Sequence, residues 1–134
     1  MPARYFILTS AAIVLSMGTG HLWLTFFSRA FSPRDSALED RMKSVSLLLS
    51  KRIVMWKAWI GFNASHSMGP ILFGLFYGYL SLTHPELLFS SPFLIWLGAA
   101  ALAFYLFLAA RYWFHLPLIG IAVSLAFYIG GMLA

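Results

Sequence analysis

Four polar side chains stand inside a long apolar stretch of this sequence. Residues 61–70 read GFNASHSMGP, which sets an amide, an imidazole and two hydroxyls among apolar neighbours. At about 100° per helical residue, Trp59, Asn63, His66 and Pro70 follow spacings of four, three and four and share one face of a helix. Amides and imidazoles bind ligands, hold metals or tie helices together through hydrogen bonds. The pattern predicts a polar site on an otherwise apolar helix.

An earlier apolar stretch carries a second imidazole, His21, on one face with Ser10 and Thr25. At 1.5 Å per residue, His21 lies about 10 Å and His66 roughly 15 to 20 Å from the corresponding ends of their helices, so the two rings can meet. A third histidine lies at the junction of the last two apolar stretches, on the same border. The candidate ligand-binding residues are therefore His21, Trp59, Asn63, His66, Ser67 and His115.

Three interpretations of His21, Asn63 and His66 stay open. The groups can lock helices together by hydrogen bonds across the interface. They can line a polar, aromatic-walled pocket for a lipophilic molecule such as a lipid or a quinone. Alternatively, His21 and His66 bind a metal or the iron of a haem, which would give a redox or enzymatic protein. Two histidines without a carboxylate are a weak metal pattern, and the sequence identifies no cofactor.

The remaining composition excludes many kinds of chemistry. The chain has no cysteine, so disulfides and thiolate sites are excluded. Carboxylates occur only in the predicted loops, where they cannot serve a proton relay inside the apolar stretches. There is no glycine-rich phosphate loop, zinc-protease helix or serine nucleophile elbow. We expect a non-catalytic binding or accessory protein, although an enzyme is not excluded.

The elements that must position these residues are membrane spans. The chain has 134 residues, 61% hydrophobic and only 10% charged, far below the roughly one-quarter charged residues of a soluble domain. Apolar stretches cover about residues 5–28, 53–82, 92–111 and 116–134, each near the roughly 20 residues that cross a bilayer. We expect an all-α protein with a single transmembrane domain over residues 1–134, an antiparallel four-helix bundle. The first stretch is expected to be a retained span rather than a cleaved signal peptide.

The basic residues predict the orientation of the chain. Seven of the nine Lys and Arg residues fall between Arg29 and Lys57, against four Asp and Glu in the whole chain. This clustering places the first loop in the cytoplasm and both termini on the other side of a bacterial inner or plasma membrane. Orientation accounts for the net charge of +5, so we expect no nucleic acid partner. The expected partners are the bilayer, a lipid or quinone-like molecule, and a second copy or a larger membrane complex.

The first loop and the small residues give two further expectations. Ser36 and Glu39 form a capping-box pair, and apolar residues then recur at helical spacing, which predicts a short amphipathic interfacial helix between the first two spans. These apolar residues are Leu38, Met42, Val45 and Leu49. Stripes of small residues predict close packing of the first two spans. The stripes are Ala12, Ser16 and Gly20 in the first span, and Gly61, Ser65, Gly69, Gly74 and Gly78 in the second.

Pro70 adds an expectation about helix shape. A proline cannot donate the hydrogen bond to the carbonyl of residue 66, and its ring crowds that carbonyl. The second span is therefore expected to kink beside His66.

The segments WKAWIGFNASHS (residues 56–67) and FGLFYGYL (residues 73–80), together with Gly20-His21-Leu22 and Arg111-Tyr112-Trp113-Phe114, resemble a family of small bacterial membrane proteins. Its members have four spans and no assigned activity. The resemblance implies a bacterial inner membrane location and four helices. It implies no substrate, cofactor or catalytic residue.

Overall fold

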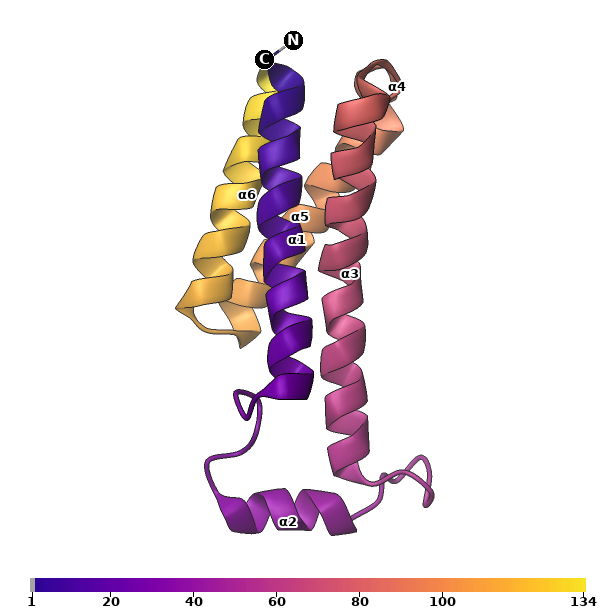
Figure 1. The fold of residues 1–134 in the computed structure, drawn as a ribbon, viewed down its shortest axis with the longest axis vertical. Coiled ribbons are helices and arrows are strands. Elements are labelled where there is room, and N and C mark those ends of the chain that lie inside the picture. Colours follow the sequence, from indigo (N-terminus) through magenta and orange to yellow (C-terminus); the bar gives the residue numbers. More distant parts are fainter. Residues whose placement is uncertain (1) are drawn as a thin grey trace. The chain divides into compact units, whose positions relative to one another are not determined.

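The protein is built from helices, as the sequence predicts. A computed structural model describes residues 2–134 (Figure 1). Within that range the helices are α1 (Ala3–Phe27), α2 (Ser36–Ser44), α3 (Met55–Thr83), α4 (Pro85–Ser90), α5 (Pro92–Tyr112) and α6 (His115–Leu133). No β-strand occurs among these residues. The all-α expectation is confirmed.

Three helices are long and apolar enough to cross a membrane: α1, α5 and α6. The protein is therefore a helical membrane protein, with fewer supported spans among residues 2–134 than the four predicted. The difference lies in α3, which has 29 residues and is the longest helix. Lys57, Asn63 and His66 in its first half lower its mean hydropathy. Helix α3 is therefore long enough to cross a membrane, but it is not among the three helices that are also apolar enough.

The described chain divides into two compact parts. The first, which we call the core part, consists of residues 2–17 and Pro70–Ala134. The second, the polar part, is Gly18–Gly69 and contains the end of α1, all of α2 and the start of α3. Both α1 and α3 run from one part into the other, and α3 is helical through Pro70. The kink predicted at Pro70 stays a prediction.

In the core part, the segment of α1 up to Met17 packs against α6, with the Ile7 side chain beside Gly131 and the Met17 side chain beside Gly120. Near the start of α1, Ile7 fills the space beside Gly131, where a Cβ atom would come within 2.8 Å of its side chain. Further along, the hydroxyls of Ser10 and Ser124 lie 2.8 Å apart, and both residues are fully buried. The Ser124 hydroxyl also lies 3.1 Å from the Ser10 carbonyl. These small side chains let the two backbones approach closely.

Two buried tyrosines join α3 and α6 to the first turns of α5. The Tyr77 hydroxyl donates to the Leu94 carbonyl at 2.7 Å, and the Tyr128 hydroxyl donates to the Ile95 carbonyl at 3.1 Å. Their rings meet edge to face with centroids 5.6 Å apart. Gly98 provides the space, because a Cβ atom there would collide with both rings. Around them lies the apolar core: Ile7, Ala11, Val14, Phe73, Leu80, Leu88 and Leu102.

The small-residue prediction is right for Gly74 of α3 and wrong for Gly61 and for the stripe on α1. A Cβ atom on Gly74 would lie 2.5 Å from Leu15 and 2.7 Å from the Ala11 carbonyl, so this glycine packs directly on α1. In contrast, Cβ atoms built on Gly20 and Gly61 meet no other part of residues 2–134 within 4 Å. The stripe predicted on α1, Ala12, Ser16 and Gly20, is exposed. Helix α1 packs instead through the face of Ile7, Ala11 and Val14, because buried apolar area outweighs small size.

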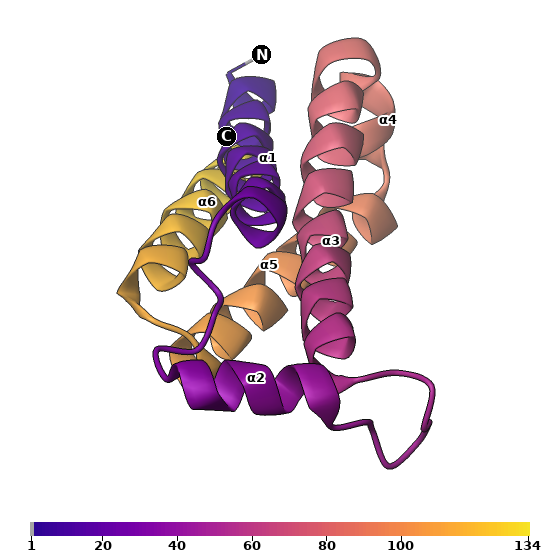
Figure 2. The ribbon, with the colours of Figure 1, turned by 60° about the horizontal axis from the view of Figure 1, so that its bottom comes forward.

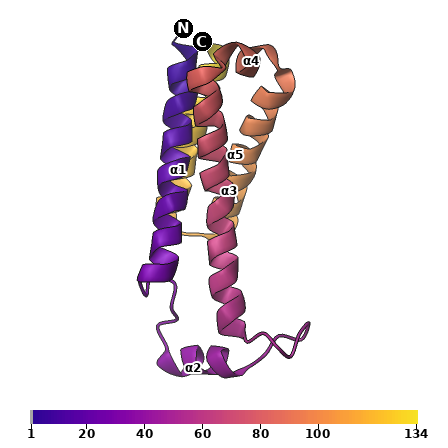
Figure 3. The ribbon, with the colours of Figure 1, turned by 45° about the vertical axis from the view of Figure 1, so that its right-hand side comes forward.

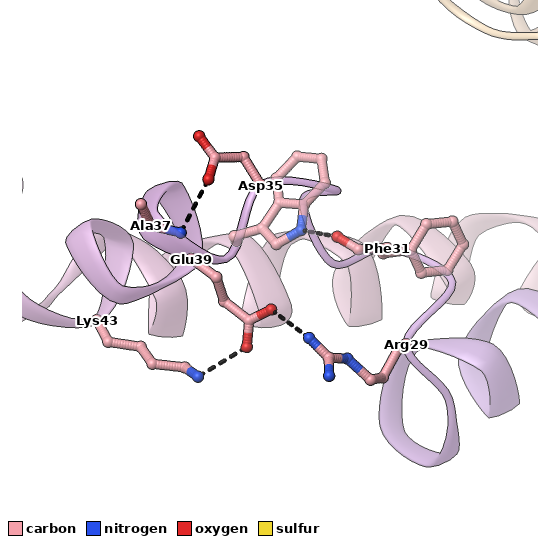
Figure 4. Close-up of polar contacts among 7 residues, drawn as sticks. Arg29, Phe31, Asp35, Ala37, Glu39 and Lys43 are labelled. Carbon is pink, nitrogen blue, oxygen red and sulfur yellow. Dashed lines mark hydrogen bonds and ion pairs between the residues drawn. The ribbon is translucent and has the colours of Figure 1, made fainter.

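Helix α2 forms where predicted but is capped differently. Its N-cap is Asp35, whose Oδ1 accepts a hydrogen bond from the Ala37 amide at 2.9 Å, and Ser36 is already the first helical residue. Glu39 takes no part in capping, because its oxygens bind Arg29 at 2.9 Å and Lys43 at 2.7 Å (Figure 4). The helix ends at Ser44, so Val45 and Leu49 of the predicted amphipathic pattern lie beyond it.

Candidate functional site

Two histidines from different helices meet in the polar part. His21 near the end of α1 and His66 in the first half of α3 have ring centroids 5.3 Å apart, with an edge-to-face angle of 73°. Both residues are half-buried. The depths estimated from the sequence predicted that the His21 and His66 rings can meet, and they are in contact in the structure. That they bind a ligand stays a prediction.

A buried amide connects the two helices at this point. Asn63 is only 2% exposed and lies one turn before His66 on α3. Its Nδ2 donates to the Trp59 carbonyl at 2.9 Å, and its side chain also lies within hydrogen-bonding reach of the His21 ring. We refer to His21, Asn63 and His66 as the histidine–amide cluster.

An aromatic residue from the first loop covers the cluster. The Phe31 ring lies with its centroid 4.5 Å from that of His21, so the chain folds back after α1. The Phe31 carbonyl accepts a hydrogen bond from Trp59 Nε1 at 2.8 Å, which fastens this loop to α3 (Figure 4). Trp59 therefore uses its only polar hydrogen for this attachment. Phe31 was not among the predicted site residues, because it lies in a polar loop with no helical period.

The hydroxyls beside the cluster bond to their own helices. Ser67 is fully buried and donates to the Asn63 carbonyl at 3.0 Å. Thr25 donates to the His21 carbonyl at 2.7 Å. Each hydroxyl hydrogen is therefore committed to the backbone four residues earlier. Ser67, one of the predicted ligand-binding residues, is left with only an acceptor oxygen.

The other two histidines lie elsewhere. His115 begins α6 in the core part and is exposed. His84 precedes α4, is also exposed, and has its Nε2 3.3 Å from the Tyr79 hydroxyl. Within residues 2–134, no group of three or more His, Asp or Glu side chains is placed to hold a metal ion. Any metal on His21 and His66 would need further ligands from outside this set.

Beneath the cluster, the polar part contains one carboxylate held by two cations. The Glu39 side chain is only 11% exposed and bridges Lys43 and Arg29. The hydrogen bond from Lys43, together with the charges of Lys43 and Arg29, holds the pKa of Glu39 below its ordinary value. This carboxylate therefore stays ionised and ties α2 to the loop that follows α1.

The cluster offers two imidazoles and an amide oxygen under aromatic cover. Such groups can donate hydrogen bonds to a carbonyl or phosphate oxygen, or accept one from a hydroxyl group. Comparison of the chain with protein-family models, with curated proteins and with solved structures gives no match. The geometry of the cluster is therefore the main guide to function.

Proposed function

We propose that this is a small, non-catalytic integral membrane protein that binds the polar head of a lipophilic molecule at the histidine–amide cluster. The observation that carries the proposal is the meeting of His21 and His66, with ring centroids 5.3 Å apart, beside the buried amide of Asn63. Imidazole and amide groups on two neighbouring helices can bind the polar head of such a molecule while its tail stays in the bilayer.

The surroundings favour a flat or carbonyl-bearing head group. Phe31 supplies aromatic surface next to the His21 imidazole, and the Trp59 ring is held beside Phe31 by its bond to the Phe31 carbonyl. Aromatic walls with a few convergent polar groups are typical of small-molecule sites. A quinone ring, whose carbonyls accept hydrogen bonds, and a lipid ester or phosphate both match this combination.

We further propose that the chain forms an antiparallel four-span bundle in a bacterial inner membrane, as in the family that it resembles. In this arrangement α3 is the fourth span and α2 lies at the cytoplasmic interface. Support comes from the basic residues concentrated between Arg29 and Lys57. Both termini then lie on the non-cytoplasmic side.

Mass spectrometry of protein purified in mild detergent, combined with thermal unfolding, tests the ligand proposal. We expect a lipid or quinone to remain bound to the parent, and added decylubiquinone or phospholipid to raise its melting temperature. Asn63→Leu and His66→Phe should abolish both effects. His84→Phe is the matched control, since His84 is exposed and lies in the core part. A parent with no retained molecule and no shift with any candidate would overturn the proposal.

A metal is the second candidate, favoured by the same pair of rings. Two imidazoles this close can both turn a nitrogen toward one ion at the roughly 2.0–2.1 Å typical of zinc, with ligand or water completing the coordination. Elemental analysis and an absorption spectrum of the parent and of His21→Ala test it. Stoichiometric metal or a Soret band that His21→Ala removes would favour this candidate over an organic ligand.

A further inference from the structure

The connection between α2 and α3 is a small hairpin rather than an open loop. The Leu47 amide donates to the Ile53 carbonyl at 3.0 Å, and the Met55 amide donates to the Val45 carbonyl at 2.9 Å. A turn closes the tip, where the Ser50 amide lies 3.3 Å from the Leu47 carbonyl. This backbone pairing holds residues 45–55 in a defined shape. The position of the tip is therefore fixed by these hydrogen bonds.

Two leucines occupy this tip, and both are fully exposed. The exposed fraction is 108% for Leu48 and 95% for Leu49, the highest among the large hydrophobic residues described. Nearby Val45 and Ile53 are also exposed, at 44% and 40%. Apolar side chains at the end of a formed hairpin gain no stability from the fold itself, so they point to an external apolar partner.

The charges around the leucines specify what kind of partner fits. Lys51 and Arg52 follow the tip directly, and both are exposed. Every ionisable residue from Arg41 to Lys57 is basic. An apolar tip flanked only by positive charge is complementary to a surface with an apolar interior and an anionic face. The cytoplasmic leaflet of a membrane with anionic phospholipids has both properties.

The position of the hairpin in the polar part agrees with such a partner. It leads directly into α3 and extends sideways from the first turn of that helix, on the side away from α2 (Figures 2 and 3). A segment beside the first turn of a helix entering the bilayer lies at the depth of the head groups. Trp56 in that first turn is an aromatic residue of the kind found at membrane interfaces.

We propose that the hairpin of residues 45–55 is a membrane anchor that inserts Leu48 and Leu49 into an anionic leaflet while Lys51 and Arg52 bind lipid phosphates. Insertion removes the two leucines from water, and the cations hold the hairpin at the surface. This inference rests on the proposed topology, in which α3 crosses the membrane from the cytoplasmic side. It does not depend on a ligand at the histidine–amide cluster.

The natural absence of cysteine makes the test direct. A spin label is attached to Leu48→Cys in the full chain, in nanodiscs of phosphatidylcholine with one-quarter phosphatidylglycerol. We expect the label to collide more with oxygen, which concentrates in lipid, than with a water-soluble nickel chelate. A label on Asp40→Cys, an exposed acidic position of α2, is the matched control and should show the opposite preference.

Further arms separate lipid from protein and test the charge. Each basic charge near an anionic surface changes the population inserted by about fivefold, so Lys51→Gln with Arg52→Gln should lower the ratio of inserted to free label more than tenfold. Pure phosphatidylcholine should have a similar effect. The proposal is overturned if the label at position 48 is as accessible to nickel as the control. It is equally overturned if the label is shielded from both reagents, which indicates contact with protein, or if charge removal changes nothing.

Discussion

Tyr77 and Tyr128 perform the same function from two different helices. Each places its hydroxyl on a carbonyl of α5, and each ring is buried, with Tyr128 fully inaccessible. In an apolar interior such a hydroxyl must find an acceptor, and these two find carbonyls because Gly98 leaves the α5 surface open. The tyrosines therefore fix α5 against both α3 and α6.

Tyr128→Phe should destabilise the protein by about 1 kcal/mol, because it removes one hydrogen bond and keeps the ring. Thermal or denaturant unfolding in detergent measures the loss. Tyr79→Phe is the matched control, since the Tyr79 hydroxyl lies at the exposed surface against His84. Equal stability of Tyr128→Phe and the parent would show that the bond contributes nothing.

Gly98→Ala should cost more than Tyr128→Phe. The added methyl group would displace both tyrosine rings, and overpacking of this kind costs typically 1–3 kcal/mol. Combining Gly98→Ala with Tyr128→Phe should recover part of the loss, because the double variant removes the hydroxyl nearest the new methyl group. If the losses of stability in the two single variants simply add in the double variant, this double-mutant cycle would argue against the contact.

The sequence predicts residues that share a helical period and misses residues that meet only through the fold. Trp59, Asn63 and His66 follow a regular spacing, so their common face was predictable, and the depth count brought His21 to them. Phe31 was not predictable, because nothing in a loop shows that the chain folds back. The pairing of Ser10 with Ser124 joins residues 114 positions apart and has no local signal.

At the scale of elements, one glycine of the stripe predicted on α3, Gly74, makes the close contact with α1. Gly74 lies against the backbone of α1 at Ala11, whereas Gly61 on the same helix faces open space within residues 2–134. The two glycines differ only in surroundings, so they form a matched pair.

Gly74→Ala should therefore destabilise the protein by roughly 1–3 kcal/mol. Gly61→Ala should leave stability unchanged or raise it by up to about 1 kcal/mol, because alanine has a higher helix propensity than glycine. Thermal unfolding of both variants in the same detergent provides the comparison. A similar loss in both would mean that Gly61 packs against a partner, such as a second copy of the chain.

The ion pairs of Glu39 predict that α2 is released at low pH. The folded pKa of Glu39 is lowered, so its contribution is complete above the ordinary glutamate pKa and is lost as the pH falls through the lower value. A spin label on Ala37→Cys, exposed on α2, should be ordered at pH 7 and gain mobility below about pH 4. Glu39→Gln should be mobile throughout this range. A label in Glu39→Gln that still becomes mobile only in acid would assign the change to another group.

Helix α2 is shorter than the spacing of its apolar residues predicts. The spacing of Leu38, Met42, Val45 and Leu49 predicts a helix over all four, yet the helix ends at Ser44. The reason is a competing partner: the Val45 carbonyl accepts the Met55 amide and so begins the hairpin. Likewise, Asp35 caps the helix in place of Ser36, because Glu39 is committed to two cations.

At the scale of the molecule, the contacts in the core part bear on how often the chain crosses the membrane. The start of α1 packs on the end of α6, with Ile7 and the Ala3 carbonyl against Gly131. The start of α1 and the end of α6 therefore lie together, which agrees with the four-span arrangement proposed above. Composition identifies three candidate spans, α1, α5 and α6, and the proposal adds α3 as the fourth.

Reporter tags at the two ends of the chain should thus be accessible from the same side of the membrane. A membrane-impermeant thiol reagent should reach Asp40→Cys from the other side, where the basic loop lies. Tags on opposite sides would show that only three helices cross, and would place α3 at the surface.

The serine pair between α1 and α6 has a consequence for how the protein is made. Helix α1 carries Ser10, and its partner Ser124 is synthesised 114 residues later. Until α6 enters the bilayer, the seam of α1 that holds Ile7 and Ser10 faces lipid or the insertion machinery. Completion of the core therefore waits for the synthesis of α6, and a chain stalled before α6 presents an unpaired polar seam that membrane quality control can recognise.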